Sequence, residues 1–387
     1  MTTYREPVGS EKAGYLHYRQ PPSPFETFMK EEGIPVYRGI GVYDSRQLPL
    51  GRWERMGGRG SYIQLSGIQG KTSLYVVEVP AAGVLNPERH MYEERFIVLE
   101  GRGTTEVWRE GGKKRSFEWA TGSVFSCPLN AWHRLVNATS SPAILLAVST
   151  APAVINMFQN RRFVFDNPFE FPERFDDSDE FFKPKEEFEP HPIQGRAMLS
   201  TNLLPDAVNC YLPLDNNRGP GYRWISPNMV GNTMLQGFIA EYPSGRYSKA
   251  HYHDSGAVLV CLKGKGFSVT WPTDLGTQPW ATGKGELVKQ QDYVAGGMIS
   301  AAPGGGNWFH QHFAIGKENF RVFNFTGGAR TDRHQEGEMV AGVGAETREG
   351  GRALPYAEED PHVRQYYKQR LAEEGVEFQM PDGDFDL

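Results

Sequence analysis

Short apolar runs, some of them alternating with polar residues, recur between residues 61 and 148, and turns that contain Gly or Pro separate them. Runs of this length predict β-strands, and strands at regular spacing are typical of a sandwich or a barrel. We therefore predict a first β-barrel over residues 51–160. Its expected strands cover residues 61–65, 72–79, 96–99, 104–108, 124–127 and 143–148.

A second barrel is predicted over residues 201–328. Within it, residues 258–262 form a continuous apolar run that indicates a buried strand, and the turn residues from Gly264 to Gly266 follow directly. Residues 161–200, between the barrels, are acidic and rich in Phe. Because disordered segments are poor in aromatic residues, we expect this linker to dock its phenylalanines on a barrel surface.

The two ends of the chain are predicted to flank the barrels. Residues 1–50 form an arm with one short helix, of the kind that packs across a neighbouring domain or subunit. Residues 329–387 form a tail. In the tail we expect a helix over residues 361–374, because Asp360 is a suitable N-cap and Gly375 a suitable stop.

The composition agrees with an all-β chain of two domains. The 387 residues include 44 Gly and 27 Pro, and 39% are hydrophobic. A net charge of −6 offers no basic surface for nucleic acid, so a small-molecule partner is expected. Cys127, Cys210 and Cys261 are too widely spaced to indicate a disulfide framework or a zinc-type pair. No signal-peptide segment or membrane-spanning run is evident, so we expect a cytoplasmic protein.

Histidines in the second predicted barrel suggest a metal centre. His251 and His253 are two residues apart, and on a strand both side chains leave the same face. His310 follows on a distant strand. Neutral imidazole is a good ligand for Fe, Zn, Cu and Ni. We predict that His251, His253 and His310 bind one divalent metal ion.

The residues around these histidines resemble the paired motifs of the cupin superfamily, which implies two jelly-roll barrels. Ala257 stands where that family usually has a glutamate ligand. This departure indicates the three-histidine subgroup, which includes oxygen-using enzymes, rather than the oxalate decarboxylase-like pattern. The matching residues are Gly245, His251, His253 and Gly264 in the first motif, and Pro303, His310 and Gly316 in the second, with Ala314 in place of the usual Asn.

The first barrel carries a weaker copy of the same motifs, which implies a two-cupin chain. His90, Glu94 and His133 match ligand positions, but Glu88 replaces the first histidine. Two readings stay open: an iron-type set of two histidines and a carboxylate, or a degenerate barrel with internal ion pairs. We expect the second barrel to hold the active site. The ion pairs of the second reading would involve Glu88, Arg89, Glu94 and Arg134.

Three further residues are candidates for catalysis. His312 shares the strand face of His310, so it is a fourth ligand, a proton-transfer group or a wall residue. Arg321 could clamp a carboxylate substrate through two hydrogen bonds. Tyr247 precedes the first ligand and is expected to line the pocket.

Three neutral ligands leave the charge of a divalent metal uncompensated, which favours an anionic or enolisable substrate with O₂ beside it. Such a centre resembles that of the gentisate and salicylate dioxygenases, and implies an Fe(II)-dependent dioxygenase that cleaves a small hydroxylated aromatic acid. The resemblance also implies a homo-oligomer. The alternatives are a redox-neutral isomerase, hydrolase or decarboxylase that uses Mn, Ni or Zn, or a non-catalytic binding protein.

Overall fold

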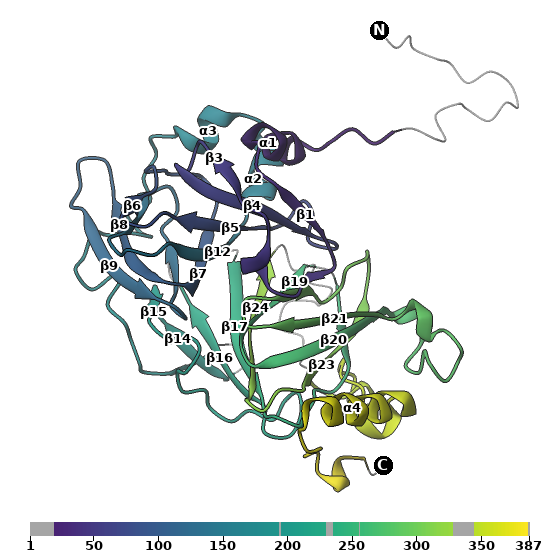
Figure 1. Cartoon of the computed structure of the whole chain (residues 1–387). Coiled ribbons are helices and arrows are strands. Elements are labelled where there is room, and N and C mark those ends of the chain that lie inside the picture. Colours follow the sequence, from purple (N-terminus) through teal and green to yellow (C-terminus); the bar gives the residue numbers. More distant parts are fainter. Residues whose placement is uncertain (1–18, 193–194, 230–234, 255, 328–343, 386–387) are drawn as a thin grey trace, which may run out of the picture.

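The computed structural model describes residues 19–192, 195–229, 235–254, 256–327 and 344–385. Two β-barrels lie side by side, with helices near both ends of the chain (Figure 1). The predicted all-β architecture with two barrels is therefore confirmed. Where the chain is described, no helix is long and apolar enough to cross a membrane.

Each barrel consists of a larger and a smaller sheet. The larger sheet of the first barrel contains β1 (Val36–Gly39), β3 (Gly51–Trp53), β4 (Gly58–Leu65), β5 (Ser73–Val79), β7 (Glu94–Glu100), β10 (Val124–Cys127), β12 (Ala143–Ser149) and β15 (Leu203–Leu204). Its smaller sheet contains β6 (Gly83–Val84), β8 (Arg102–Trp108), β9 (Arg115–Ala120) and β11 (Trp132–Asn137).

The second barrel is built in the same way. Its larger sheet contains β2 (Gly41–Val42), β13 (Glu189–Pro190), β14 (Ala197–Ser200), β16 (Arg223–Asn228), β17 (Leu235–Tyr242), β19 (Ala257–Lys263), β22 (Met298–Ser300) and β24 (Phe320–Gly327). Its smaller sheet contains β18 (His251–His253), β20 (Lys265–Pro272), β21 (Lys289–Val294) and β23 (Trp308–Ala314).

The strand order repeats from one barrel to the other. The order β4-β5-β12-β7-β10 in the first larger sheet matches β16-β17-β24-β19-β22 in the second. Likewise, β6-β11-β8-β9 matches β18-β23-β20-β21 in the smaller sheets. The internal repeat that the motifs indicated therefore extends over the whole barrel.

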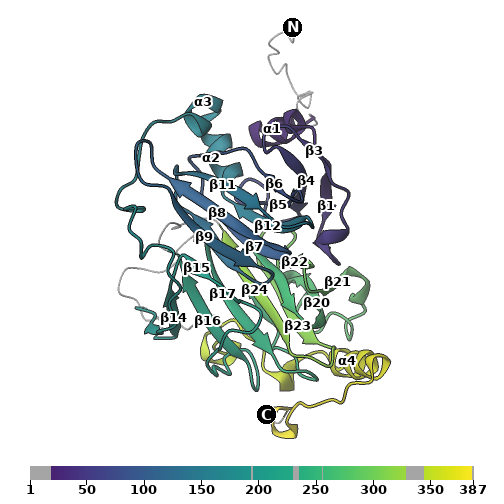
Figure 2. The same ribbon diagram turned by 60° about the vertical axis from the view of Figure 1, so that its left-hand side comes forward.

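The barrels exchange short strands. β15 lies after the linker in sequence but pairs with β10 of the first barrel, and β2 of the N-terminal arm pairs with β22 of the second. Apolar side chains of both larger sheets form one buried cluster, which includes Ile97 and Leu146 from one barrel and Val260 and Phe323 from the other. The two barrels therefore share a core at their interface (Figure 2).

The strand predictions for the first barrel hold for all six runs, but β9 and β11 were not predicted. β9 alternates between exposed and buried positions, so only Phe117 and Trp119 are buried in it. β11 alternates in the same way and carries His133. Half-exposed strands have a weak apolar signal, which explains why both were missed.

The helices begin and end where the capping residues indicated. α1 (Pro24–Glu32) is capped by Ser23 and ends at Gly33, which has a φ of 71°. α4 (Pro361–Glu374) is capped by the Asp360 side chain and ends at Gly375. Two further helices, α2 (Ala151–Phe158) and α3 (Arg161–Phe165), follow the first barrel.

The acidic linker docks two of its phenylalanines in the first barrel. Phe175 and Phe182 are buried in the barrel core, and the Phe182 ring stacks on Phe117 with 4.3 Å between ring centroids. Phe169, by contrast, is 59% exposed. The linker is thus held in place by some of its aromatic residues rather than by all of them.

Candidate metal centres

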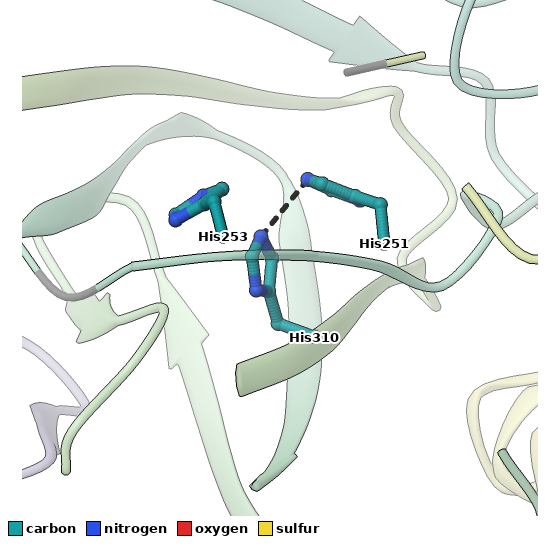
Figure 3. Close-up of side chains that lie close together, drawn as sticks. All are labelled: His251, His253 and His310. Carbon is teal, nitrogen blue, oxygen red and sulfur yellow. Dashed lines mark hydrogen bonds between the residues drawn. The ribbon is translucent and has the colours of Figure 1, made fainter. Parts of the chain in front are cut away.

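The centre of the second barrel is formed by two neighbouring strands of the smaller sheet. β18 and β23 are antiparallel, and their register places His251 directly opposite His310. His253 leaves the same face of β18 as His251, because side chains alternate along a strand. One nitrogen from each imidazole lies within 4.8 Å of the others. The three predicted ligands therefore converge, as Figure 3 shows.

Backbone carbonyl groups orient the three rings. The distance from Nδ1 to a carbonyl oxygen is 3.4 Å for His251, 2.7 Å for His253 and 3.3 Å for His310. A carbonyl can only accept a hydrogen bond, so it favours the tautomer with the proton on Nδ1. The Nε2 lone pairs then point toward one another.

The spacing of these lone pairs fits a cation. Nε2 of His251 and Nε2 of His310 lie 2.9 Å apart. Burial is the main cause that lowers the pKa of both histidines well below the ordinary value, so a shared proton is disfavoured near pH 7. Two ligands at right angles and about 2.1 Å from one metal ion would be separated by about 3.0 Å. The donor set thus fits one divalent metal.

Arg218 places a positive charge beside this centre. After burial, its charge is among the causes that lower the pKa of His253 to about 4 and that of His312 to about 3. The position of Arg218 is fixed by its backbone, because its carbonyl accepts a 2.8 Å hydrogen bond from Lys249 N, two residues before His251. The sequence analysis missed Arg218, since the surrounding Asn-Asn-Arg-Gly turn is typical of an exposed loop.

His312 lies beside the three ligands without joining them. Its ring centroid is 5.5 Å from that of His310 and 6.0 Å from that of His251. Its Nδ1 is 2.7 Å from the Ser268 hydroxyl on β20. Among the described residues, the set whose donor atoms converge is His251, His253 and His310. His312 is thus a neighbour of the metal centre, not a fourth ligand in this arrangement.

The structure does not bring Tyr247 to the centre. Its ring stacks on Phe313, whose side chain leaves the opposite face of β23 from His310 and His312, and its hydroxyl donates a 2.5 Å hydrogen bond to Glu359. Tyr247 therefore belongs to the apolar layer under α4. The sequence could place Tyr247 near the ligands along the chain but not on the correct side of the sheet.

Arg321 also binds groups other than those of the metal centre. Its guanidinium donates to Glu241 at 2.7 Å and to the carbonyl oxygens of Ala207 and Cys210. Both charged side chains are almost fully buried. The expected substrate clamp is therefore an internal ion pair that joins β24 to β17 and to the loop before β16.

The first barrel brings four groups together at the equivalent place. One atom each from Glu88, His90, Glu94 and His133 lies within 4.8 Å of the others. Glu94 Oε2 is 3.4 Å from His90 Nε2 and 3.8 Å from His133 Nε2. Glu88 Oε1 is 3.8 Å from His133 Nε2. Glu88, which shares the strand parity of His90 in the sequence, thus lies with the other three groups.

The orientation of these groups fits a metal ligand set. Nδ1 of each histidine faces a backbone carbonyl, at 2.8 Å for His90 and 3.1 Å for His133. One oxygen of each carboxylate accepts a hydrogen bond from another side chain: Tyr75 donates to Glu94 Oε1, and Arg55 donates to Glu88 Oε2. Within the described residues, the buried His133 Nε2 has no hydrogen-bond partner. A divalent ion would be bound by this nitrogen and by the inward-facing oxygens Glu88 Oε1 and Glu94 Oε2.

The ion pairs of the alternative reading are not the ones observed. Arg134 pairs with Glu106, while the Arg89 guanidinium lies over the Trp132 ring, 4.8 Å from its centroid. Burial alone would raise the pKa of Glu88, but Arg55 and the two histidines outweigh burial and lower it. Glu88 is therefore an ionised carboxylate at the centre.

The two centres differ at two equivalent positions: Glu88 stands where the second has His251, and Glu94 stands where the second has Ala257. Glu94 is the first residue of β7, and Ala257 is the first residue of the matching strand β19. The first centre therefore has a carboxylate where the second has only a methyl group. As a result, the first centre offers four protein ligands and the second offers three.

Comparisons with known proteins agree with this architecture. Residues 75–149 match the family model described as Cupin domain. No curated protein sequence matches the chain. Among solved structures, an oxalate decarboxylase of Bacillus subtilis, described as having Mn(II) centres, has a TM-score of 0.46 and 11% identity, with 76% of this chain and 79% of that chain covered.

Two other structures are similar to the same degree. The oxalate decarboxylase of Lactobacillus farciminis in a formate complex has a TM-score of 0.46 and 12% identity over 75% of this chain and 86% of that chain. The Momordica charantia 7S globulin has a TM-score of 0.46 and 14% identity over 75% and 84%. None of these three is a dioxygenase, so the resemblance to gentisate and salicylate dioxygenases stays a prediction. The family match covers a segment of the first barrel, and the strand order of that barrel repeats in the second.

Proposed function

We propose that the chain is a metal-dependent enzyme whose active centre is formed by His251, His253 and His310 in the second barrel. Its reaction is the oxygen-dependent cleavage of a small hydroxylated aromatic acid or a related enolisable anion, with Fe(II) as the metal and O₂ as co-substrate. The observation that carries this proposal is Ala257, which stands where the first centre has Glu94.

The missing carboxylate supports catalysis in the second barrel. Structural metal sites are closed by protein ligands, whereas catalytic sites keep a position open for substrate. The four groups of the first barrel, both carboxylates and both imidazoles, are directed inward and leave fewer positions open around an ion than the three histidines of the second. The methyl group of Ala257 leaves the equivalent position of the second centre without a protein ligand. We infer that the first centre is structural and the second catalytic.

The charge around the second centre supports an anionic substrate. Its three ligands are neutral histidines, and the partly buried Arg218 adds a positive charge beside them. A guanidinium binds a carboxylate through paired hydrogen bonds, more strongly where water is excluded. We infer that Arg218 takes the role of substrate clamp that the sequence analysis gave to Arg321.

Redox-active Fe(II) at this centre would supply the one-electron chemistry that O₂ requires. The residues of the chain then bind and orient the substrate. His251 and His310 are buried and exclude bulk water from one side, while His253 is partly exposed and marks the side from which a small molecule enters.

Oxygen consumption tests the proposed reaction. The protein is freed of metal with a chelator, reloaded with Fe(II) under nitrogen and mixed with salicylate, gentisate and simple β-diketones in aerated buffer. We expect oxygen uptake with at least one of these compounds in the wild-type protein, and none in His310→Ala. His133→Ala serves as the matched control, because it removes a histidine of the first centre. Substrate conversion without oxygen uptake would indicate the redox-neutral alternative, and binding without conversion the non-catalytic one.

A further inference from the structure

A buried chain of three polar side chains ends at His312. The Tyr293 hydroxyl is 2.7 Å from the Ser268 hydroxyl, which is in turn 2.7 Å from His312 Nδ1. All three residues are almost fully buried. Ser268 lies opposite His312 on the neighbouring strand β20, and Tyr293 lies on β21. These hydrogen bonds have no role in the reaction proposed above.

The direction of these hydrogen bonds follows from the tyrosine. In the described part of the protein, Ser268 is the hydrogen-bond partner found for the Tyr293 hydroxyl, and Tyr293 is 0% exposed. A buried phenol that does not donate its proton is destabilising, so Tyr293 donates to Ser268. The single proton of the Ser268 hydroxyl is then donated to His312 Nδ1. A neutral His312 consequently carries its own proton on Nε2.

The opposite direction leaves more groups unsatisfied. If His312 donated from Nδ1 to Ser268, and Ser268 to Tyr293, the phenol proton would have no acceptor among the described residues. The Nε2 of His312 would also lack a proton to donate. When Tyr293 donates to Ser268 and Ser268 donates to His312, the tyrosine proton has an acceptor. Of the three side chains, one donor then still needs an acceptor, His312 Nε2–H.

This tautomer distinguishes His312 from the three metal ligands. Carbonyl groups hold the ligands with the proton on Nδ1 and the lone pair on Nε2, as a metal requires. The Ser268 hydroxyl favours the other tautomer of His312, with the proton on Nε2 and the lone pair on Nδ1. Because Nδ1 faces β20, Nε2–H lies on the other side of the ring, in the barrel interior that also contains the ring of His310.

We propose that His312 is a substrate-positioning residue, which uses Nε2–H to donate a hydrogen bond to a negatively charged substrate oxygen, and that Ser268 and Tyr293 set the tautomer which makes this possible. The proposal rests on the proposed function in one respect, the anionic class of the substrate. His312 thus gives the second centre a hydrogen-bond donor outside the metal ligand set, and Arg218 adds a positive charge nearby. The substrate class that fits is a small acid with a carboxylate and a second anionic oxygen.

Nitrogen-15 NMR of the metal-free protein, with labelled histidine, tests the tautomer directly. We expect the His312 signals, assigned by their loss in His312→Gln, to show a protonated Nε2 in the wild type. In Ser268→Ala the Nδ1 partner is lost, and the Nε2–H signature should weaken or disappear. Tyr293→Phe removes the donor that directs the Ser268 hydroxyl, so Ser268 can then donate to His312 Nδ1 or accept from it, and the Nε2–H signature should weaken there as well. A proton on Nδ1 in the wild type would overturn the proposal.

Binding of salicylate to the Co(II)-loaded protein, followed by visible absorption, tests the positioning role. We expect affinity to fall about tenfold or more in His312→Leu and to be partly restored in His312→Gln, whose amide presents an N–H. Metal content should stay unchanged in both variants. Equal affinity in all three proteins would overturn the proposal. Neither this measurement nor the NMR experiment requires oxygen uptake, so failure of the dioxygenase assignment would be distinguishable from failure of the positioning role.

Discussion

His251 and His310 face each other across β18 and β23, with 2.9 Å between their Nε2 atoms and a backbone carbonyl near Nδ1 of each ring. Two lone pairs at this distance repel each other unless a cation lies between them. The pair therefore fits a candidate metal site whose converging ligands are all histidines. The same reasoning applies to the first barrel, where Glu88 and Glu94 supply the charge.

Metal analysis of variants follows from this geometry. The wild-type protein, purified without chelator and reloaded with Mn(II) or Fe(II), is expected to bind two metal ions per chain. His310→Ala should remove the ion of the second barrel and His133→Ala that of the first, each leaving one. Tyr252→Phe, which changes a side chain on the other face of β18, is the control and should keep both. Loss of both ions in either histidine variant would contradict two independent centres.

Introducing the missing carboxylate should close the second centre. In Ala257→Glu, or in the shorter Ala257→Asp if the larger side chain disturbs folding, we expect metal to bind at least as tightly as in the wild type. Salicylate binding and oxygen uptake should both fall by at least about tenfold, since the open position is filled. Isothermal titration with metal and with salicylate measures the two effects separately. A variant that retains full activity would show that the open position lies elsewhere.

Arg218 should control substrate affinity rather than metal affinity. Loss of a buried charged hydrogen-bonding partner weakens binding by about 2 kcal/mol or more, so we expect Arg218→Gln to raise KM by about thirtyfold. Metal content should not change. Arg223→Gln is the matched control, because the Arg223 guanidinium donates to the carbonyl of Leu212 at 2.8 Å. An unchanged KM in Arg218→Gln would exclude Arg218 as the clamp.

The convergence of the three histidines could be predicted from the sequence because it follows largely from local patterns. His251 and His253 share a strand face by simple alternation, and the surrounding glycines mark the turns of the barrel. Helix α4 could likewise be predicted from its capping residues. These features depend on neighbours a few residues away, so a pattern is enough to find them.

The residues around the ligands depend on contacts that no local pattern reveals. Tyr247 was expected in the pocket, yet it pairs with Phe313 on the outer face of the sheet. Arg321 was expected as the clamp, yet Glu241 on β17 neutralises it. Arg218 comes from a loop whose composition indicates an exposed turn, and only the fold brings it to the histidines. Both errors and the omission concern partners more than thirty residues away in sequence.

Acid should destabilise the metal-free protein as the pH falls below about 6.5. The folded protein holds the pKa of His253 at about 4 and that of His312 at about 3, mainly through burial, whereas the unfolded chain protonates both near pH 6.5. The unfolded state thus binds more protons below pH 6.5, and stability falls as the pH decreases from there to about 4. We expect a loss of about 2–3 kcal/mol per histidine at most.

Urea unfolding at several pH values, with and without Mn(II), measures this effect. His312→Gln, which cannot titrate, should show a shallower decline than the wild type below pH 6.5. A decline of equal steepness in both proteins would mean that His312 is already protonated in the folded state.

Glu359 should give the opposite pH dependence, and it tests the structural role assigned to Tyr247. Burial raises the pKa of Glu359 to about 7, although Tyr247 and Gln311 donate hydrogen bonds to it. The folded state therefore binds more protons than the unfolded state between about pH 4.5 and 7, and this group's contribution to stability decreases as the pH rises through that range. In Glu359→Gln the dependence should vanish, so the variant should gain about 2–3 kcal/mol relative to the wild type between pH 4.5 and 8.

Tyr247→Phe should lower stability by about 1 kcal/mol without changing metal content or salicylate affinity. A loss of salicylate affinity in Tyr247→Phe would return Tyr247 to the substrate pocket, where the sequence analysis had placed it.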